Sequence, residues 1–342
     1  MLDSVCAQVS ALERAGERVV LVTSGAIARG MRLLDLGARP RGMDALQACS
    51  AIGQGDLFRA YESRLADGGT RAAQVLLTLS DVSERSHYLN VRNTLDRLLD
   101  WKVVPVINEN DTTATDEVTF GDNDFLAALV AALLNARLLV LLTNTDGVFT
   151  GDPRTDPEAE LVSSIEDTQV LETIRIGESS ALGRGGMQSK ITSARIASES
   201  GVPVVICNGT RAEELAAAAA GGAVGTRFTA KAEDRLPPYK LWLKYAKQPS
   251  GTVLVDPGAA VRLRDSGSSL LAVGVTGKRG SFRAGDAVLV AEGGAESAIG
   301  KGISEYSSDD IGRTAGHKSA YLREHFPEVP EEVIHRDRFV LL

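Results

Sequence analysis

The chain has 342 residues, of which 44% are hydrophobic and 24% are charged, and its formal net charge is −8. This is the composition of an ordinary globular protein, and the length suggests two domains. The negative charge argues against bulk attraction to nucleic acid or to an anionic membrane. The sequence contains no apolar run as long as a membrane span and no basic segment typical of a signal peptide, so we expect a cytoplasmic protein without a membrane partner.

The three cysteines, Cys6, Cys49 and Cys207, are odd in number and far apart in the sequence. Cysteine ligands of a metal would need to cluster, so we interpret these residues as free thiols in a reducing compartment. A catalytic cysteine is the disfavoured alternative, and we expect no metal site formed by protein side chains.

Buried strands are predicted by four short aliphatic runs, at 19–22, 103–107, 138–142 and 202–206. Continuous apolarity is typical of strands buried on both faces, as in parallel sheets. Helical patterns occur between them, at 4–15, 88–99, 125–134 and 189–200. The alternation predicts an α/β domain, a three-layer αβα sandwich with a mostly parallel sheet. Ligands of such sheets bind beyond the carboxyl ends of the strands.

The pattern changes near 234–238, and the helical period fades after residue 250. Short apolar segments at 252–255, 270–275 and 287–290 are separated by Gly, Asp and Ser. This spacing predicts a small β-barrel or sandwich. The predicted organisation is therefore an α/β domain over 1–232, a linker over 233–249 and a β domain over 250–342.

Polar residues are concentrated in the segments 108–111 (Asn-Glu-Asn-Asp) and 121–124 (Gly-Asp-Asn-Asp). The first follows a predicted strand and the second precedes a predicted helix, so a rigid scaffold would hold both. Such a cluster could bind the ammonium group of an amino acid, a metal or both. A well-capped helix is the alternative, because Asp and Asn are good N-caps. One cap residue would be enough, so the number of polar residues favours a binding site.

Two further segments suit an anion. Thr23-Ser24-Gly25 forms a strand-to-helix turn whose backbone N–H groups could face an anion. In the segment 183–190 (GRGGMQSK), glycines would let backbone amides approach a phosphate, and Lys190 follows at the start of a helix. The GxxxxGK[ST] spacing of a Walker A loop is absent. A flexible connection with a solvated Lys190 is the alternative.

Together these segments resemble the glutamate 5-kinases of the amino acid kinase family. The matching stretches are VTSGAIARG from Val22, VPVINENDTTATDEVTFGDNDFLAALVA from Val104, LLTNTDGVFTGDPR from Leu141 and GRGGMQSK from Gly183. The segment from Gly251 through 267–271 to 315–319 looks like the PUA domain of many members. The resemblance implies transfer of the ATP γ-phosphoryl group to the side-chain carboxylate of L-glutamate. The product would be glutamyl 5-phosphate, the first intermediate of proline synthesis.

The resemblance also implies roles for individual residues. Ser24, Asp111 and Asn123 would hold glutamate, with Asp111 pairing with the substrate ammonium. Lys190 would neutralise charge on the transferred phosphoryl group, and Asp124 would orient basic groups at the reaction centre. Mg²⁺ would arrive with ATP, bound through phosphate oxygens and water. The ATP site would be lined by Thr143, Asn144, Gly183, Arg184, Gly185, Gly186, Met187, Gln188, Ser189 and Lys190.

The chain departs from the pattern of the family at several positions. Asn144 stands where Asp is usual, and Arg184 and Ser189 each replace a Thr. In the family, a first strand with a Lys-x-Gly-Ser-like phosphate loop precedes a helix like the one predicted over 4–15, and here Met1 stands almost at that helix. A start codon placed too late is the favoured explanation, and a shortened, impaired paralogue is the alternative. The chain as written is expected to show weak or no kinase activity.

An RNA-binding or regulatory protein acting through the PUA module is the competing function, because PUA domains elsewhere bind RNA. Residues 250–342 carry 11 Lys plus Arg and 13 Asp plus Glu, a net charge of 11 − 13 = −2. Binding to a phosphate backbone normally needs a basic face, so the kinase is favoured. A kinase for another carboxylate or a carbamate remains a third reading. Feedback inhibition by proline and formation of a homo-oligomer are expected from the resemblance.

Overall fold

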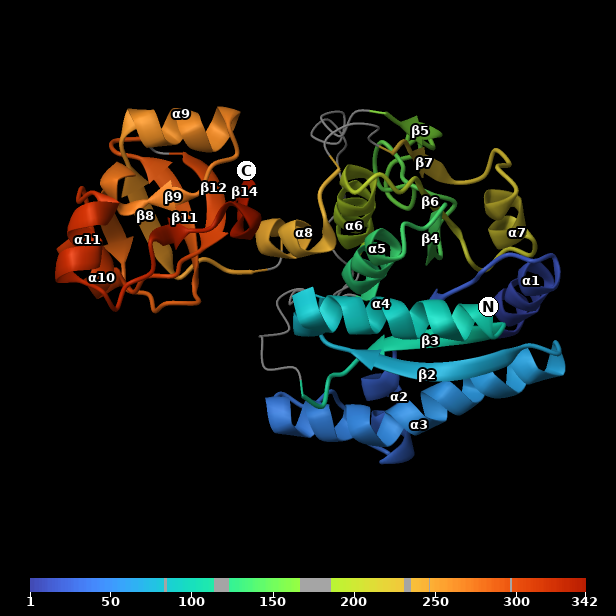
Figure 1. The fold of residues 1–342 in the computed structure, drawn as a ribbon. Coiled ribbons are helices and arrows are strands. Elements are labelled where there is room, and N and C mark those ends of the chain that lie inside the picture. Colours follow the sequence, from blue (N-terminus) through green and yellow to red (C-terminus); the bar gives the residue numbers. More distant parts are fainter. Residues whose placement is uncertain (83–84, 114–122, 167–185, 231–234, 246, 296) are drawn as a thin grey trace. The chain divides into compact units, whose positions relative to one another are not determined.

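The computed structural model describes residues 1–82, 85–113, 123–166, 186–230, 235–245, 247–295 and 297–342. The chain divides into two compact units, Met1–Pro238 and Tyr239–Leu342. The segment that the sequence predicts as a linker contains helix α8 (Pro238–Tyr245), shown in Figure 1. Leu241 and Leu243 of α8 are fully buried, and the ammonium of Lys301 donates to the carbonyls of Lys244 and Lys247 at the helix end. Helix α8 is therefore packed, and the carbonyls near its end are bonded.

The first unit is built on mostly parallel strands. One sheet has the order β1-β3-β2, with β1 (Leu21–Val22) and β2 (Arg71–Leu77) both parallel to β3 (Val103–Glu109). The second sheet has the order β4-β6-β7-β5, and its strands are β4 (Leu139–Thr143), β6 (Val204–Asn208), β7 (Thr226–Phe228) and β5 (Ser164–Ile165). Among the strand pairs described in this sheet, β6–β7 is antiparallel, whereas β4–β6 and β5–β7 are parallel. The predicted α/β class is confirmed, but the strands form two hydrogen-bonded sheets rather than one.

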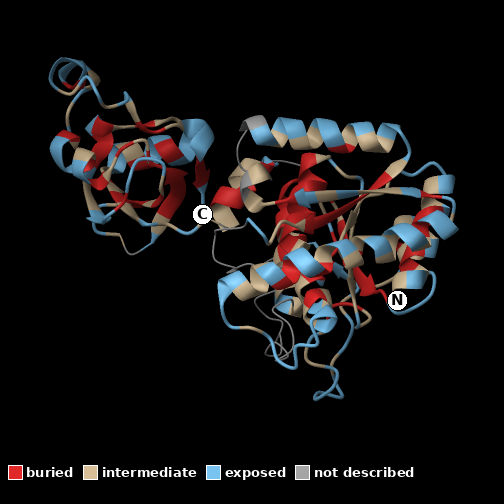
Figure 2. Ribbon diagram, turned by 90° about the horizontal axis from the view of Figure 1, so that it is seen from below, coloured by how far each residue is buried: buried red, intermediate tan, exposed pale blue. Residues whose placement is uncertain are grey.

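Helices cover these sheets, and their bounds are α1 (Leu2–Arg14), α2 (Ala26–Leu33), α3 (Met43–Asp67), α4 (Arg85–Asp100), α5 (Asn123–Leu133), α6 (Met187–Glu199) and α7 (Glu214–Ala219). Figure 2 shows the buried interior of the unit between helices whose outer sides are exposed. Every residue of α5 from Phe125 to Leu133 is buried, because α5 packs against strands of both sheets and against α6. A helix that is apolar on all sides requires such a position. Among the residues that the structure describes, no helix combines the length and the apolarity of a membrane span.

Helices α2 and α3 cross at two glycines. A Cβ atom at Gly53 would lie 1.9 Å from the carbonyl oxygen of Ala26, and one at Gly30 would lie 1.8 Å from that of Cys49. Only glycine therefore permits this approach of the two backbones. The crossing fixes the position of α3, which contributes side chains to the site described below.

We expect Gly53→Ala to destabilise the protein by about 1–3 kcal/mol or more, because the added methyl group would collide with the backbone of α2. Gly55→Ala in the same helix is the matched control, since no atom lies within 4 Å of the added Cβ. That control should stabilise the protein by about 0.5–1 kcal/mol, since alanine is the better helix former. Thermal unfolding of the two variants measures the difference, and equal midpoints would contradict the role of the crossing.

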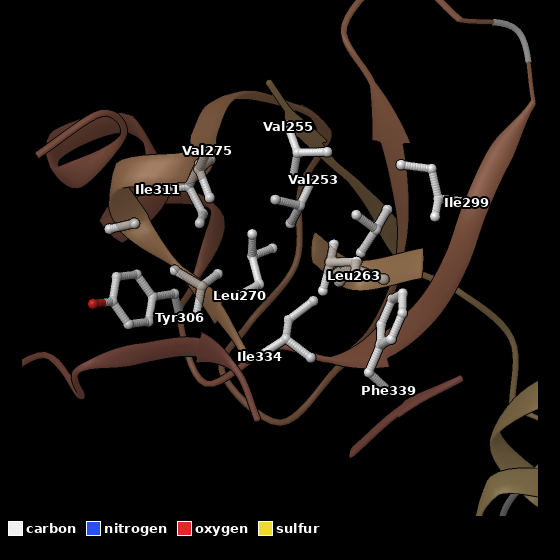
Figure 3. Close-up of a cluster of buried hydrophobic side chains, with 14 of the residues drawn as sticks. Val253, Val255, Leu263, Leu270, Val275, Ile299, Tyr306, Ile311, Ile334 and Phe339 are labelled. Atoms are coloured by element: carbon white, nitrogen blue, oxygen red, sulfur yellow. The ribbon is translucent and has the colours of Figure 1, made fainter. Parts of the chain in front are cut away.

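The second unit contains a five-stranded sheet of order β10-β8-β11-β12-β14 and a two-stranded pairing of β13 with β9. Its strands are β8 (Gly251–Val255), β9 (Leu270–Leu271), β10 (Val275–Gly280), β11 (Ala287–Glu292), β12 (Ala298–Ile303), β13 (Glu332–Ile334) and β14 (Phe339–Leu341). Its helices are α9 (Pro257–Asp265), α10 (Ser308–Thr314) and α11 (Ser319–His325). Figure 3 shows Val253, Leu270 and Ile334 in a cluster of buried apolar side chains of this unit. The predicted small β domain is confirmed.

Candidate active site

The ends of β1 and β3 meet the start of α5. The two strands are parallel neighbours, with Val22 beside Ile107, so the residues that follow them lie at the same edge. The side-chain nitrogen of Asn123 donates to the carbonyl of Thr23 at 2.6 Å and to Oδ1 of Asn108 at 2.8 Å. The structure therefore brings the predicted residue Asn123 to the strand ends that carry the other predicted substrate residues.

Ser24 is exposed at the turn between β1 and α2. Gly25, which follows it, has φ of 107° and is the N-cap of α2. A left-handed conformation at this point favours glycine and allows the chain to enter the helix directly after the strand. The Ser24 hydroxyl is thus held at the carboxyl edge of the sheet, where the sequence placed it.

Asp124 and Lys190 form a close ion pair between α5 and α6. The Lys190 ammonium lies 2.9 Å from Oδ1 and 2.8 Å from Oδ2 of Asp124. The side chain of Lys190 is only 14% exposed and that of Asp124 only 15%. A mostly buried ammonium held by both carboxylate oxygens has a well-defined position, as a group that must stabilise developing charge requires. The structure therefore joins the two residues predicted to act at the reaction centre.

Asp111 lies just beyond β3 and accepts a hydrogen bond of 2.8 Å from the Ser50 hydroxyl of α3. Burial raises the pKa of Asp111, while the Ser50 bond and the positive charge of Arg39 oppose that rise. Burial, and then the charge of Asp111, raise the pKa of Glu109 to about 7. Two partly buried carboxyl groups two positions apart favour a cationic ligand, which would offset their mutual repulsion.

The raised pKa of Glu109 predicts a pH-dependent cost in stability. Between about pH 4.5 and 7 an unfolded chain ionises this carboxyl while the folded chain keeps it protonated, so stability falls as pH rises through this window. Glu109→Gln removes the group that titrates. We expect this variant to gain stability over the unchanged chain at pH 8, and the gain to shrink towards pH 5. Denaturant midpoints at the two pH values test this, and a gain of equal size at both would refute it.

The predicted nucleotide side of the site lies at the ends of β4 and β6. Thr143 is the last residue of β4 and pairs in register with Asn208, and the exposed Asn144 follows it. The Asn208 side-chain amide donates to Asp146 at 2.8 Å, and the Arg211 guanidinium pairs with the same carboxylate at 2.5 Å. These contacts fasten the turn after β4 to the loop after β6. No role was predicted from the sequence for Asp146, Asn208 or Arg211.

Helix α6 begins where the predicted glycine loop ends. Gly186 is its N-cap, and Met187, Gln188, Ser189 and Lys190 form its first turn. The free N–H groups at the start of a helix suit a phosphate, so this part of the predicted ATP site fits an anionic ligand. Gly183, Arg184 and Gly185 lie outside the described residues, as do Gly121 and Asp122.

All three cysteines are buried free thiols. Burial raises the pKa of Cys6 to about 11 and that of Cys207 to about 12. These two side chains therefore remain protonated at neutral pH, where a nucleophilic cysteine would need to be a thiolate.

The contribution of α3 to the site was not predicted from the sequence. Ser50 bonds to Asp111, and Oε1 of Gln54 accepts a 2.7 Å hydrogen bond from the amide of Asn108. Positions four apart in a helix share a face, so the spacing of Ser50 and Gln54 was the available signal. That signal needs a predicted helix over 43–67, and none was predicted there.

Comparison with known proteins supports the kinase interpretation. The family model of the amino acid kinase family matches residues 1–208, and that of the PUA domain matches residues 251–326. The chain belongs to the amino acid kinase family, and its C-terminal unit is a PUA domain.

Within this family the chain is similar to glutamate 5-kinases over nearly its whole length. It is 46% identical to the glutamate 5-kinase of Pseudomonas savastanoi pv. phaseolicola over 338 residues, which are 98% of this chain and 91% of that protein. It is 45% identical to that of Stutzerimonas stutzeri, over 98% of this chain and 90% of that protein. It is 42% identical to that of Geobacter sulfurreducens, over 100% of this chain and 92% of that protein.

Proposed function

We propose that this chain catalyses the ATP-dependent phosphorylation of the side-chain carboxylate of L-glutamate, which yields glutamyl 5-phosphate for proline synthesis. The observation that carries the proposal is the start of α5. There Asn123 is bonded to the ends of β1 and β3, and the next residue, Asp124, holds the Lys190 ammonium. Groups suited to an amino acid and a cation suited to a phosphoryl group thus occupy adjacent positions. The relatives that are named glutamate 5-kinases support the same substrate.

Glutamate binding is assigned to Asp111, Asn123 and Ser24. The Asp111 carboxylate is aimed by Ser50 and would pair with the substrate ammonium. The Ser24 hydroxyl and the turn amides next to it would hold the α-carboxylate. The side-chain carboxylate of the substrate would then point towards Lys190.

Phosphoryl transfer needs no nucleophile from the protein, because an oxygen of the substrate carboxylate attacks the γ-phosphorus and the bond to the β–γ bridging oxygen breaks. Lys190 would balance the negative charge that spreads over the transferred group, and Asp124 would keep its ammonium in place. The ATP site is assigned to Thr143, Asn144, Gly183, Arg184, Gly185, Gly186, Met187, Gln188, Ser189 and Lys190. In the part of the chain that the structure describes, no three or more His, Cys, Asp or Glu side chains cluster as metal ligands. Mg²⁺ would arrive with ATP, since it commonly binds through phosphate oxygens and water.

Four further assignments belong to this proposal. The kinase domain would comprise 1–232, the linker 233–249 and the PUA domain 250–342, and the division of the chain after Pro238 falls inside that linker. Proline would compete with glutamate, because it also presents an ammonium and a carboxylate on one carbon. A homo-oligomer is supported by large apolar side chains that the single chain leaves exposed at the end of α2, among them Leu33, Leu34 and Leu36. The protein would act in the cytoplasm.

The test is an assay with ATP, Mg²⁺ and L-glutamate in which hydroxylamine traps the acyl phosphate. The expected result is hydroxamate that forms only when all three are present. L-aspartate and glutarate serve as alternative acceptors, the first with a shorter side chain and the second without the ammonium. Faster turnover of either of them than of L-glutamate would overturn the substrate assignment.

A further inference from the structure

Asn123 carries a buried acceptor without a hydrogen-bond partner. Its side-chain nitrogen makes two hydrogen bonds, to Thr23 and to Asn108, whereas its Oδ1 is buried and has no partner among the described residues. Leaving a buried polar atom unpaired costs about 1–3 kcal/mol. Such an atom needs an explanation, and a donor that arrives with a ligand is one.

The direction of the Asn123 amide is fixed by its neighbours. The main-chain carbonyl of Thr23 can only accept, so Asn123 must turn its nitrogen towards it. The second hydrogen of that nitrogen also needs an acceptor, which is Oδ1 of Asn108. The nitrogen of Asn108 then faces Oε1 of Gln54 at 2.7 Å. Asn108 is only 2% exposed, so water does not replace these partners.

We propose that Gln54, Asn108 and Asn123 form an amide relay that makes Asn123 present an oxygen to the substrate, with Gln54 as the positioning residue at its end. The relay selects a substrate that donates an N–H to this oxygen, namely the α-ammonium of an amino acid. This inference rests on the proposed function and adds to it the means by which an amino acid is distinguished from a simple dicarboxylate.

Helix α3 aims two of the acceptors from one face. Ser50 donates to one oxygen of Asp111, which leaves the other oxygen of that carboxylate for a ligand. Gln54, one turn later, sets the relay that leaves Oδ1 of Asn123 for the same kind of ligand. Two acceptors directed by one rigid helix match a group with several N–H donors, such as an ammonium.

The test compares Gln54→Leu with Gln54→Glu in the full chain. Leucine removes the acceptor that holds Asn108, so the KM for glutamate should rise about tenfold, the effect of losing one hydrogen bond. The kcat and the KM for ATP should stay unchanged. In Gln54→Glu the new side chain keeps an oxygen at the same distance from the backbone, so the KM for the substrate should stay as low as in the unchanged chain. An unchanged KM in Gln54→Leu, or an equal rise in Gln54→Glu, would overturn the relay.

Glutarate gives a second readout that a loosened fold would not reproduce. It shares both carboxylates of glutamate but lacks the ammonium, so its inhibition constant should be the same for Gln54→Leu and for the unchanged chain. A rise that equals the rise in the glutamate KM would show general damage to the site and refute the selection of the ammonium. The proposed function fails separately, since it requires the unchanged chain to phosphorylate glutamate at all.

Discussion

Replacing Lys190 with methionine is expected to lower kcat by roughly 10²–10³-fold, the usual loss when one group that stabilises transition-state charge is removed. The KM for glutamate should change little, because the proposed role of the Lys190 ammonium is towards the group in transfer rather than towards the amino acid. Steady-state kinetics with ATP and L-glutamate measure both constants. A variant that keeps its kcat would show that Lys190 only balances Asp124.

The ion pair complicates this experiment, because Lys190→Met leaves the mostly buried Asp124 carboxylate without its cation. Breaking a buried pair in this way costs about 3–5 kcal/mol and could unfold the protein. The double variant Lys190→Met with Asp124→Asn removes both charges and keeps the shapes of the side chains. It should unfold near the temperature of the unchanged chain and still lack activity, which separates catalysis from stability.

Much of the fold could be predicted because the strands and helices at its centre are apolar throughout. The run at 103–107 lies in β3, and the run at 138–142 largely coincides with β4. The helix predicted over 125–134 is α5, which begins two residues earlier at Asn123. Burial on every side leaves a continuous apolar signal that needs no partner to be recognised. The run at 19–22 is the exception, since only Leu21–Val22 forms the strand β1.

Helix α3 was not predicted because its apolar residues do not form the continuous run or regular stripe that marks the central elements. It buries Ser50 and Gly53 and exposes Ile52, so apolar and buried positions coincide only in part. Its N-cap, Gly42, makes no side-chain capping bond that would mark the start. The close crossing with α2 at Gly30 and Gly53, which the sequence does not reveal by itself, adds to the apolar packing of Leu65 in positioning the helix. Without a predicted α3, the sequence could show that the segment 108–111 is polar. It could not show which of its side chains are held in position by hydrogen bonds, or which residues hold them.

Alanine at position 111 is expected to raise the KM for glutamate by at least about 30-fold, because truncating one member of a hydrogen-bonded charge pair costs about 2–5 kcal/mol. Asp111→Asn keeps the shape and the bond from Ser50 but loses the charge, so its KM should be intermediate. Loss of the charge at 111 also lowers the pKa of Glu109, which Asp111 helps to raise. Glu109 should then ionise at a lower pH, although burial still raises its pKa, and its negative charge should offset part of the missing charge near neutral pH.

This compensation gives the Asp111 variants a pH dependence that distinguishes electrostatic from structural effects. In Asp111→Ala the KM for glutamate should fall as pH rises from 5 to 7, because Glu109 ionises and supplies a negative charge for the ammonium. The double variant Asp111→Ala with Glu109→Gln has no carboxyl to ionise at these two positions, so its KM should stay high across the same range. Kinetics at three pH values for both variants measure the difference. Unchanged glutamate affinity in Asp111→Ala would refute the assignment of the ammonium to this carboxylate, and parallel pH profiles would refute the coupling to Glu109.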